Sequence, residues 1–242
     1  MKSTFDLSLI LPCYNEEPVF KTSIERLIQL LNKTQYNYEI ILIDDKSQDT
    51  TAQLIKELAQ SNSRIKYVLH QHNTGRGGVV MEGLKLAQGE IAGYLDIDLE
   101  VPPENILSHA LAIENGYDVA YANRITKFEW HNIHRHLMHS VYIGLQKIWL
   151  GTPFQDTNAG CKFFNREKII PSILQCKETH WFWDTEILVR SYFNKLKMKE
   201  LPVLYIPNPR KKSTVKKIND TVYFLKKTFE FRKTLNELKK IS

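Results

Sequence analysis

The chain has 242 residues, of which 43% are hydrophobic, enough for the core of one α/β domain or of one domain with an appendage. It contains no run of about 18 apolar residues that could span a bilayer. Its first residues lack the apolar core and the small-residue cleavage site of a signal peptide. Three widely spaced cysteines, Cys13, Cys161 and Cys176, argue against a disulfide framework. We therefore expect a protein of the reducing cytoplasm without a membrane-spanning segment.

The net charge of +6 is concentrated at the C-terminal end of the chain. Residues 205–242 carry 11 of the 33 Lys and Arg residues and 3 of the 27 Asp and Glu residues, a net +8 that leaves −2 for the rest. Such a basic segment attracts anionic partners, of which a membrane surface and nucleic acid are the two classes to consider.

The first half of the chain alternates apolar runs with helical patterns. Helices are predicted to end near residues 31, 58, 88 and 115, the first with its apolar side chains on one buried face. The runs between them predict strands over 7–12, 39–43, 65–69, 91–95 and 118–122. Strands that alternate with helices indicate βαβ units and a largely parallel sheet covered on both faces.

The second half is less regular. We expect a helix over 130–151, a loop that enters a strand over 155–164, a helix over 181–193 and a strand over 198–206. From residue 214 onward, apolar residues fall at helical spacing with lysines between them, which predicts a basic amphipathic helix. Its apolar residues are Val215, Ile218, Val222, Leu225 and Phe229.

Polar residues recur where the predicted strands of the first half end. They are Asn15 and Glu16, Asp44 and Asp45, Asn73, and Asp96 with Asp98. Open α/β sheets bind their ligands at the carboxyl edge of the strands. The recurrence therefore predicts a ligand site at that edge.

The pair Asp96 and Asp98 predicts a metal site. Two clustered carboxylates repel each other unless a cation or protons neutralise them. Hard oxygen ligands suit Mg²⁺ or Mn²⁺, which usually take further ligands from substrate phosphates. The alternative is an acidic turn before a helix that opens at Pro102. A zinc site is disfavoured, because the spacing of four histidines allows at best two ligands on one helical face; they are His131, His134, His136 and His139.

Four ordered motifs, 11–17, 44–51, 73–78 and 96–100, resemble the family 2 inverting glycosyltransferases with the GT-A fold. Within that family the chain is most similar to the polyprenyl-phosphate sugar transferases, the group of dolichyl-phosphate mannose synthase, through 116–119 and Asn123-Arg124. The resemblance covers residues 5–213. It implies an α/β, Rossmann-like GT-A domain over 1–213, followed by the basic amphipathic helix over 214–242.

The resemblance also implies roles for single residues on the donor side. Glu100 could be a third metal ligand or a helix cap, and Asp45 could bind substrate or cap a helix. Gly75 and Arg76 would close over the nucleotide, and Arg124 would meet phosphate with its fixed donor fork. The nucleotide and metal would be held by Asp96 and Asp98, and the base and ribose would lie against Pro12, Tyr14, Glu16 and Asp44.

On the acceptor side the resemblance leaves alternatives open. Asp156 would lie beside the donor sugar, and Asp184 or Glu186 would be the catalytic base if one is needed. A lipid phosphate is already anionic and needs no strong base, whereas a sugar hydroxyl must lose a proton. Acceptor contacts would come from Trp181, Trp183, Ser140, Arg210 and Lys216. For the tryptophans the alternative is core packing, and for the basic residues it is a solvated run.

The expected activity is transfer of a hexose from a GDP- or UDP-sugar to a polyprenyl phosphate, assisted by Mg²⁺ or Mn²⁺, with inversion at the anomeric carbon. The first alternative acceptor is a sugar hydroxyl of a glycan or lipid-linked saccharide. A non-catalytic protein that binds nucleotides or nucleic acid is the rival from another class; we expect no nucleic-acid partner. The C-terminal helix would hold the protein on the cytoplasmic face of a membrane, or would pack on the domain or on a second copy in a homodimer.

Overall fold

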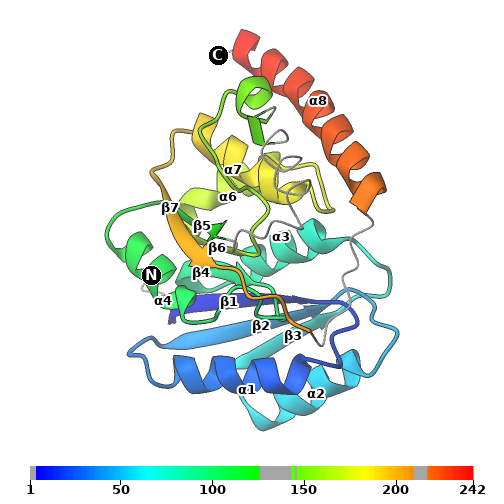
Figure 1. Ribbon diagram of the computed structural model, residues 1–242. Coiled ribbons are helices and arrows are strands. Elements are labelled where there is room, and N and C mark those ends of the chain that lie inside the picture. Colours follow the sequence, from blue (N-terminus) through cyan, green and yellow to red (C-terminus); the bar gives the residue numbers. More distant parts are fainter. Residues whose placement is uncertain (1–3, 126–142, 145, 210–216, 242) are drawn as a thin grey trace.

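The computed structural model describes residues 4–125, 143–144, 146–209 and 217–241. The described residues form a seven-stranded sheet at the centre of the molecule (Figure 1). From one edge to the other, its strands are β3 (Ile65–Leu69), β2 (Tyr38–Asp44), β1 (Phe5–Cys13), β4 (Gly89–Leu95), β6 (Cys161–Asn165), β5 (Val119–Ile125) and β7 (Met198–Leu204).

Helices cover both faces of the sheet, as expected. One face is covered by α1 (Phe20–Leu31), α2 (Thr51–Ser61) and α4 (Asn105–Glu114), and the other by α3 (Arg76–Leu86), α6 (Arg166–Gln175) and α7 (Trp183–Phe193). Figure 1 shows the sheet between these two layers. Each face has its own apolar core, because the inner strands are apolar on both sides.

The sheet is mostly parallel, as expected, and β6 runs against the other strands. This strand pairs antiparallel with both β4 and β5, whereas the pairs β1–β2, β1–β4, β2–β3 and β5–β7 are parallel. The start of β6 therefore lies at the same edge as the ends of the other strands. The backbone N–H of Asp96, just after β4, donates to the carbonyl of Gly160, just before β6, at 2.9 Å.

Glycines let neighbouring elements approach closely at two places. A Cβ on Gly83 of α3 would lie 2.5 Å from a side-chain carbon of Ile10, and a Cβ on Gly93 of β4 would lie 2.4 Å from the ring of Phe163. Real Cβ atoms do not come this close to other carbons. These glycines thus set the distance of α3 from β1 and allow the large Phe163 ring to fill the core beside β4.

Helix α6 is a feature that the sequence patterns did not predict. The side chain of Asn165 caps it by accepting the Lys168 backbone N–H at 3.2 Å, and Ile169 and Ile173 face the core. Pro171 lies inside the helix and obscures the pattern. Most of the helix expected over 130–151 lies outside the described residues, and so do the four histidines and Ser140.

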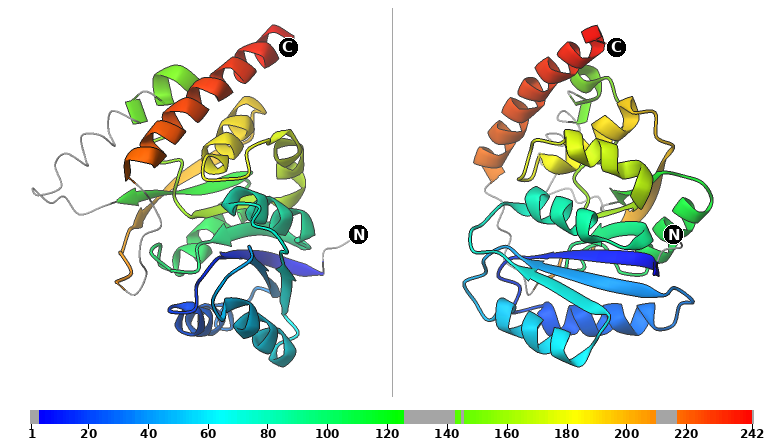
Figure 2. Two further views of the ribbon diagram at one scale, coloured as in Figure 1. Left: turned by 90° about the vertical axis from the view of Figure 1, so that its right-hand side faces the viewer. Right: turned by 180° about the vertical axis from the view of Figure 1, so that it is seen from behind.

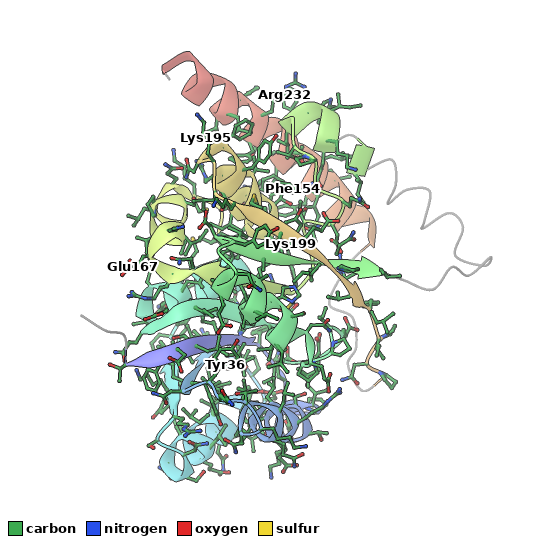
Figure 3. All side chains as sticks on the ribbon, turned by 90° about the vertical axis from the view of Figure 1, so that its left-hand side faces the viewer. Tyr36, Phe154, Glu167, Lys195, Lys199 and Arg232 are labelled. Carbon is green, nitrogen blue, oxygen red and sulfur yellow. The ribbon has the colours of Figure 1, made fainter. Side chains whose placement is uncertain are left out.

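The C-terminal helix α8 (Lys217–Ile241) packs above the α7 side of the body (Figures 1 and 2). Its buried face contains Thr228, Phe231 and Leu235, with Phe224 partly buried. The face predicted from the sequence is a different one, since Val222 and Phe229 are 61% and 51% exposed. Figure 3 shows Arg232, a residue of α8, far from the sheet, and Phe154 between α8 and the sheet.

Within the described part of the chain, no helix combines the length and apolarity that crossing a bilayer requires. The three cysteines are free thiols; Cys13 and Cys161 are buried in the core, and Cys176 is half-buried after α6. Burial raises the pKa of the Cys161 thiol to about 12.

Candidate active site at the carboxyl edge

The loops after β1 and β2 lie side by side and form the first part of the carboxyl edge. The Glu16 backbone N–H donates to the Thr51 hydroxyl, and the Asn15 N–H donates to the Ser47 hydroxyl, both at 2.8 Å. The Ser47 N–H in turn donates to the buried carboxylate of Asp44 at 3.0 Å. The structure thus brings together the four residues expected to line the base and ribose pocket, which are Pro12, Tyr14, Glu16 and Asp44. Of these, the Tyr14 ring is exposed.

Asp45 has a structural role that corrects its assignment to substrate binding. Its carboxylate accepts the backbone N–H groups of Thr74 and Gly75 at 2.7 and 2.9 Å, and it lies 2.9 Å from the ring of His70. The other His70 nitrogen lies 2.8 Å from Glu82. Burial alone would lower the pKa of His70, but Asp45 and Glu82 outweigh it and raise that pKa above 6.5. Asp45 is therefore the anchor of the loop that precedes α3.

Arg76 is the first residue of α3, after Gly75 in a left-handed conformation with φ of 86°. Its guanidinium donates to Asp96 from Nη2 at 2.7 Å and from Nε at 3.0 Å. The same group contacts Asp184 and lies over the rings of Tyr94 and Trp181, at 5.3 and 5.6 Å from their centroids. Arg76 is thus placed at the acidic pair, as its expected position in the nucleotide site requires.

Asp184 belongs to a buried charge cluster beneath Arg76. It accepts the Lys162 ammonium at 2.6 Å, together with the Arg76 guanidinium and the Tyr94 hydroxyl. The Lys162 side chain is wholly buried, and its ammonium also donates to the carbonyl of Ala159 at 2.7 Å. Burial would raise the pKa of Asp184, but the two cations outweigh it and lower that pKa. The carboxylate of Asp184, expected as a candidate base, is thus held by two cations in this structure.

Glu186 is also engaged in structure. Its carboxylate accepts the backbone N–H of Lys177 at 3.1 Å and that of Glu178 at 2.8 Å. It also pairs with Arg190, one turn along α7, at 2.6 Å, and both side chains are buried. Glu186, the other candidate base, therefore joins residues 177–178 to α7 in this structure.

The two tryptophans at the start of α7 have different environments. Trp183 is fully buried, and a Cβ on Gly77 would lie 2.3 Å from the Cβ of Trp183. It packs against the ring of Tyr94 at 5.8 Å between centroids. Trp183 is a core residue, which corrects its assignment to substrate binding, whereas the exposed Trp181 lies at the site over Arg76.

The acidic pair fits a divalent cation through two carboxylates. Asp96 and Asp98 supply hard oxygen ligands at the end of β4, and Mg²⁺ commonly binds through one or two carboxylates together with substrate phosphates. The carboxylate of Glu100, the third expected ligand, accepts the Tyr205 hydroxyl at 2.7 Å and the Asn208 N–H at 3.3 Å. Across the described ranges, no group of three or more His, Cys, Asp or Glu residues is placed to hold a metal ion.

Arg124 is paired with Asp156 rather than directed at an open site. The guanidinium donates to the two carboxylate oxygens from Nε at 2.7 Å and from Nη2 at 3.0 Å. Burial would raise the pKa of Asp156, but the Arg124 charge outweighs it and lowers that pKa. The pair joins the end of β5 to the loop before β6, so the Arg124 guanidinium that was expected to meet phosphate is paired with a carboxylate in this structure. Ser140, Arg210 and Lys216 lie outside the described residues.

Sequence reasoning missed Lys162 and Glu178. A signal for Lys162 exists, because it is a lysine within the apolar run Cys161–Phe164. Such a position requires a buried counter-charge, and here that counter-charge is Asp184. Glu178 carries no comparable signal in the sequence. Its partners, described below, come from a helix about 45 residues further along the chain.

Comparison with known proteins identifies relatives of the chain. Residues 8–170 match the family model described as "Glycosyl transferase family 2". The chain is 27% identical over 207 residues to glycosyltransferase AglD of Haloferax volcanii. This alignment covers 84% of the chain and 33% of AglD. It is 30% identical over 178 residues to an undecaprenyl-phosphate 4-deoxy-4-formamido-L-arabinose transferase of Edwardsiella ictaluri. That alignment covers 73% of this chain and 54% of the transferase. The chain thus spans about a third to a half of the length of these relatives.

Solved structures show the same fold. Glucosyl-3-phosphoglycerate synthase from Mycobacterium tuberculosis, crystallised with Mn²⁺, UDP and glucosyl-3-phosphoglycerate, matches with a TM-score of 0.70 and 16% identity. The match covers 95% of this chain and 80% of that chain. It confirms the GT-A architecture expected from the sequence.

Proposed function

The chain belongs to glycosyl transferase family 2, and from this premise we propose that it transfers a hexose from a GDP- or UDP-sugar to a polyprenyl phosphate. The observation that carries the proposal is the state of the two candidate bases. Asp184 and Glu186 are both buried and both ion-paired, each with an arginine. An acceptor that is already anionic needs neither of them, whereas a sugar hydroxyl would need a free carboxylate.

The donor would bind along the carboxyl edge. The loops that carry Tyr14 and Asp44 would receive the base and ribose, with the exposed Tyr14 ring available for stacking. Asp96 and Asp98 would hold a divalent cation, which offsets negative charge on the departing diphosphate when it is bound. The Arg76 guanidinium lies on Asp96 and is 11% exposed, so it can supply a second positive charge to the same diphosphate.

The acceptor phosphate would approach the anomeric carbon from the face opposite the leaving diphosphate, which inverts the configuration. The attacking oxygen carries its own negative charge, and the protein's task is to orient it. Trp181 is the exposed aromatic residue beside Arg76 and is suited to border the sugar or the lipid. Arg210 and Lys216 remain the basic residues proposed to meet the acceptor phosphate.

The relatives support this choice of substrates. Transferases named for undecaprenyl phosphate occur among them, from Edwardsiella ictaluri and also, at 36% identity over 128 residues, from Proteus mirabilis. The glucosyl-3-phosphoglycerate synthase with the same fold was crystallised with Mn²⁺ and UDP-glucose. We therefore propose UDP-sugars first and GDP-sugars second, with Mg²⁺ or Mn²⁺.

The exposed side of α8 supports a peripheral membrane location. Val222 and Phe229 are exposed on it, and the exposed Ile148 neighbours Trp149, whose ring meets that of Phe229 at 6.3 Å. Apolar side chains among lysines are typical of helices that lie at an anionic membrane surface. We place this surface on the cytoplasmic face, where nucleotide sugars and a reducing environment coincide.

The test is an acceptor competition with the purified chain. UDP- and GDP-hexoses are supplied with Mn²⁺ and either a short polyprenyl phosphate or the matching polyprenol, which lacks the phosphate. Transfer to the polyprenyl phosphate alone is the expected result, because Asp184 and Glu186, the two candidate bases, are both ion-paired. Transfer to the polyprenol or to a free saccharide would overturn the lipid-phosphate acceptor, and binding without any transfer would favour a non-catalytic protein.

A further inference from the structure

We infer that α8 positions the donor loop, and that Glu178 links α8 to that loop. The donor loop is defined as residues 73–78, and the connecting loop as residues 177–182 between α6 and α7. The part of this inference that concerns donor binding rests on the proposed function, in which Arg76 and Asp96 bind a nucleotide diphosphate. The mechanical part concerns only contacts within the chain.

The first contact joins α8 to the connecting loop. The Glu178 carboxylate pairs with the Lys227 ammonium at 2.8 Å and accepts the Tyr223 hydroxyl at 3.1 Å. Burial would raise the pKa of Glu178, but Lys227 and its other donors outweigh it and lower that pKa. The ring of Phe182, at the other end of the connecting loop, meets the ring of Phe231 of α8 at 5.8 Å. Both ends of the connecting loop therefore contact α8.

The second contact joins the connecting loop to the donor loop. The carbonyl of Thr179 accepts the backbone N–H of Gly78 at 2.8 Å. Gly78 lies in the first turn of α3, where backbone N–H groups have no partner within the helix, so this bond fixes the start of α3. A Cβ on Gly75 would lie 2.4 Å from the His180 ring and 2.6 Å from the Thr179 carbonyl. The two loops thus touch without spare volume.

Arg76 lies between these contact points. It follows Gly75 and precedes Gly77, and a Cβ on Gly77 would lie 2.8 Å from the carbonyl of His180. The guanidinium rests on Trp181 of the connecting loop and donates to Asp96. A shift of the connecting loop therefore moves the start of α3, and with it the distance between Arg76 and Asp96.

The connecting loop is also held by α7, so its position should depend on α8 only in part. Glu186 accepts the backbone N–H of Glu178, as described above, and the guanidinium of its partner Arg190 lies 5.2 Å from the ring centre of Phe231. Loss of the Lys227 contact should leave this support in place. The loop should then loosen without unfolding, and the donor site should weaken while the domain stays folded.

Lys227 and Lys226 form a matched pair of neighbours on α8 for the experiment. Lys227 reaches Glu178, whereas Lys226 is 74% exposed and lies 3.9 Å from Glu230. Lys227→Met and Lys226→Met remove the same charge from the same helix. Lys227→Arg retains the charge and serves as the rescue variant, and Tyr223→Phe removes the hydroxyl that donates from α8 to Glu178 without changing the charge.

The first readout is amide hydrogen exchange without any ligand. We expect the amides of residues 75–80, Gly78 above all, to exchange about tenfold faster in Lys227→Met than in Lys226→Met, with Lys227→Arg close to the wild type. Amides in β1 and β4 should be unchanged in all variants. Equal exchange of residues 75–80 in Lys227→Met and Lys226→Met would overturn the inference, whether or not the protein binds nucleotide.

The second readout is donor affinity, with UDP and Mn²⁺ as the probe and turnover measured in parallel. We expect Lys227→Met to raise the Kd for UDP and the KM for the sugar donor about three- to tenfold, with kcat nearly unchanged. Faster exchange with unchanged donor affinity would overturn the role of α8 in positioning the donor site. If the wild type binds neither UDP nor GDP, the proposed function fails, and the exchange experiment still decides whether α8 positions the loop.

Discussion

Asp184→Asn tests the buried charge cluster, because it removes the carboxylate that Lys162 and Arg76 share. The Lys162 side chain is wholly buried and would retain the Ala159 carbonyl and the face of the Tyr94 ring as neighbours of its ammonium. Removing one partner of a buried ion pair typically costs about 3–5 kcal/mol, since it leaves an uncompensated charge in a low-dielectric interior. Lys162→Met should cost less, because Asp184 keeps the Arg76 guanidinium and the Tyr94 hydroxyl.

The measurement is a double-mutant cycle by urea unfolding, followed through tryptophan fluorescence. If the unfolding free energy falls by about 3 kcal/mol per M of urea, Asp184→Asn should lower the urea concentration at the unfolding midpoint by about 1 to 1.7 M. The double variant Asp184→Asn, Lys162→Met no longer contains the buried lysine. Its loss of unfolding free energy should therefore be smaller than the sum of the two single losses by about 2 kcal/mol. A loss below about 1 kcal/mol for Asp184→Asn, or additive single effects, would refute the view that Lys162 and Asp184 stabilise each other in the core.

Three further predictions concern the metal, the pH and the membrane. Asp98→Asn should lower turnover at least about a hundredfold while leaving the melting temperature nearly unchanged; near-normal turnover in chelator-treated buffer would contradict a metal at this position. The pKa of His70 is raised in the folded state, so the stability that it contributes is complete below about pH 6.5 and is lost as the pH rises through the folded value. The melting temperatures of His70→Asn and wild type should therefore differ most near about pH 6 and converge near about pH 9; a gap that widens with pH would contradict this. The full chain should sediment with anionic vesicles at low salt and less at high salt, because each nearby Lys or Arg adds about 1 kcal/mol of attraction to the anionic surface. Phe229→Ser should weaken the binding. Equal binding to neutral vesicles would argue against an electrostatic contribution to membrane binding.

The strands of the donor half were predictable because each is a predominantly apolar run. The run over 39–43 became β2 (Tyr38–Asp44), and the run over 65–69 became β3 with the same bounds. The inner strand β2 is buried along its whole length, as such a run predicts, whereas β3 lies at the edge of the sheet and only its Ile65 is buried. The polar residues that follow them were likewise found at one edge of the sheet, because parallel strands end together.

The direction of β6 was not predictable from its residues. The pattern of a strand is the same in both directions, and the direction follows from which partners close the sheet. The same limit applies to Asp184. Its residue type suits a catalytic base, but its partners Lys162 and Arg76 are 22 and 108 positions away in the chain. Only the folded structure shows that this carboxylate is paired with two cations, whereas the partner of Glu186, Arg190, lies one helical turn away in the sequence.

The placement of the three thiols offers an internal pair of chemical probes. A thiol must be exposed and ionised before an alkylating reagent attacks it, and burial raises the pKa of both Cys161 and Cys176. Cys161 opens β6 in the core, so its labelling rate at neutral pH reports global unfolding. Cys176 directly precedes the connecting loop and is half-buried, so it is labelled whenever that loop opens locally. The ratio of the two labelling rates therefore separates motion of the loop from loss of the fold within one untagged molecule.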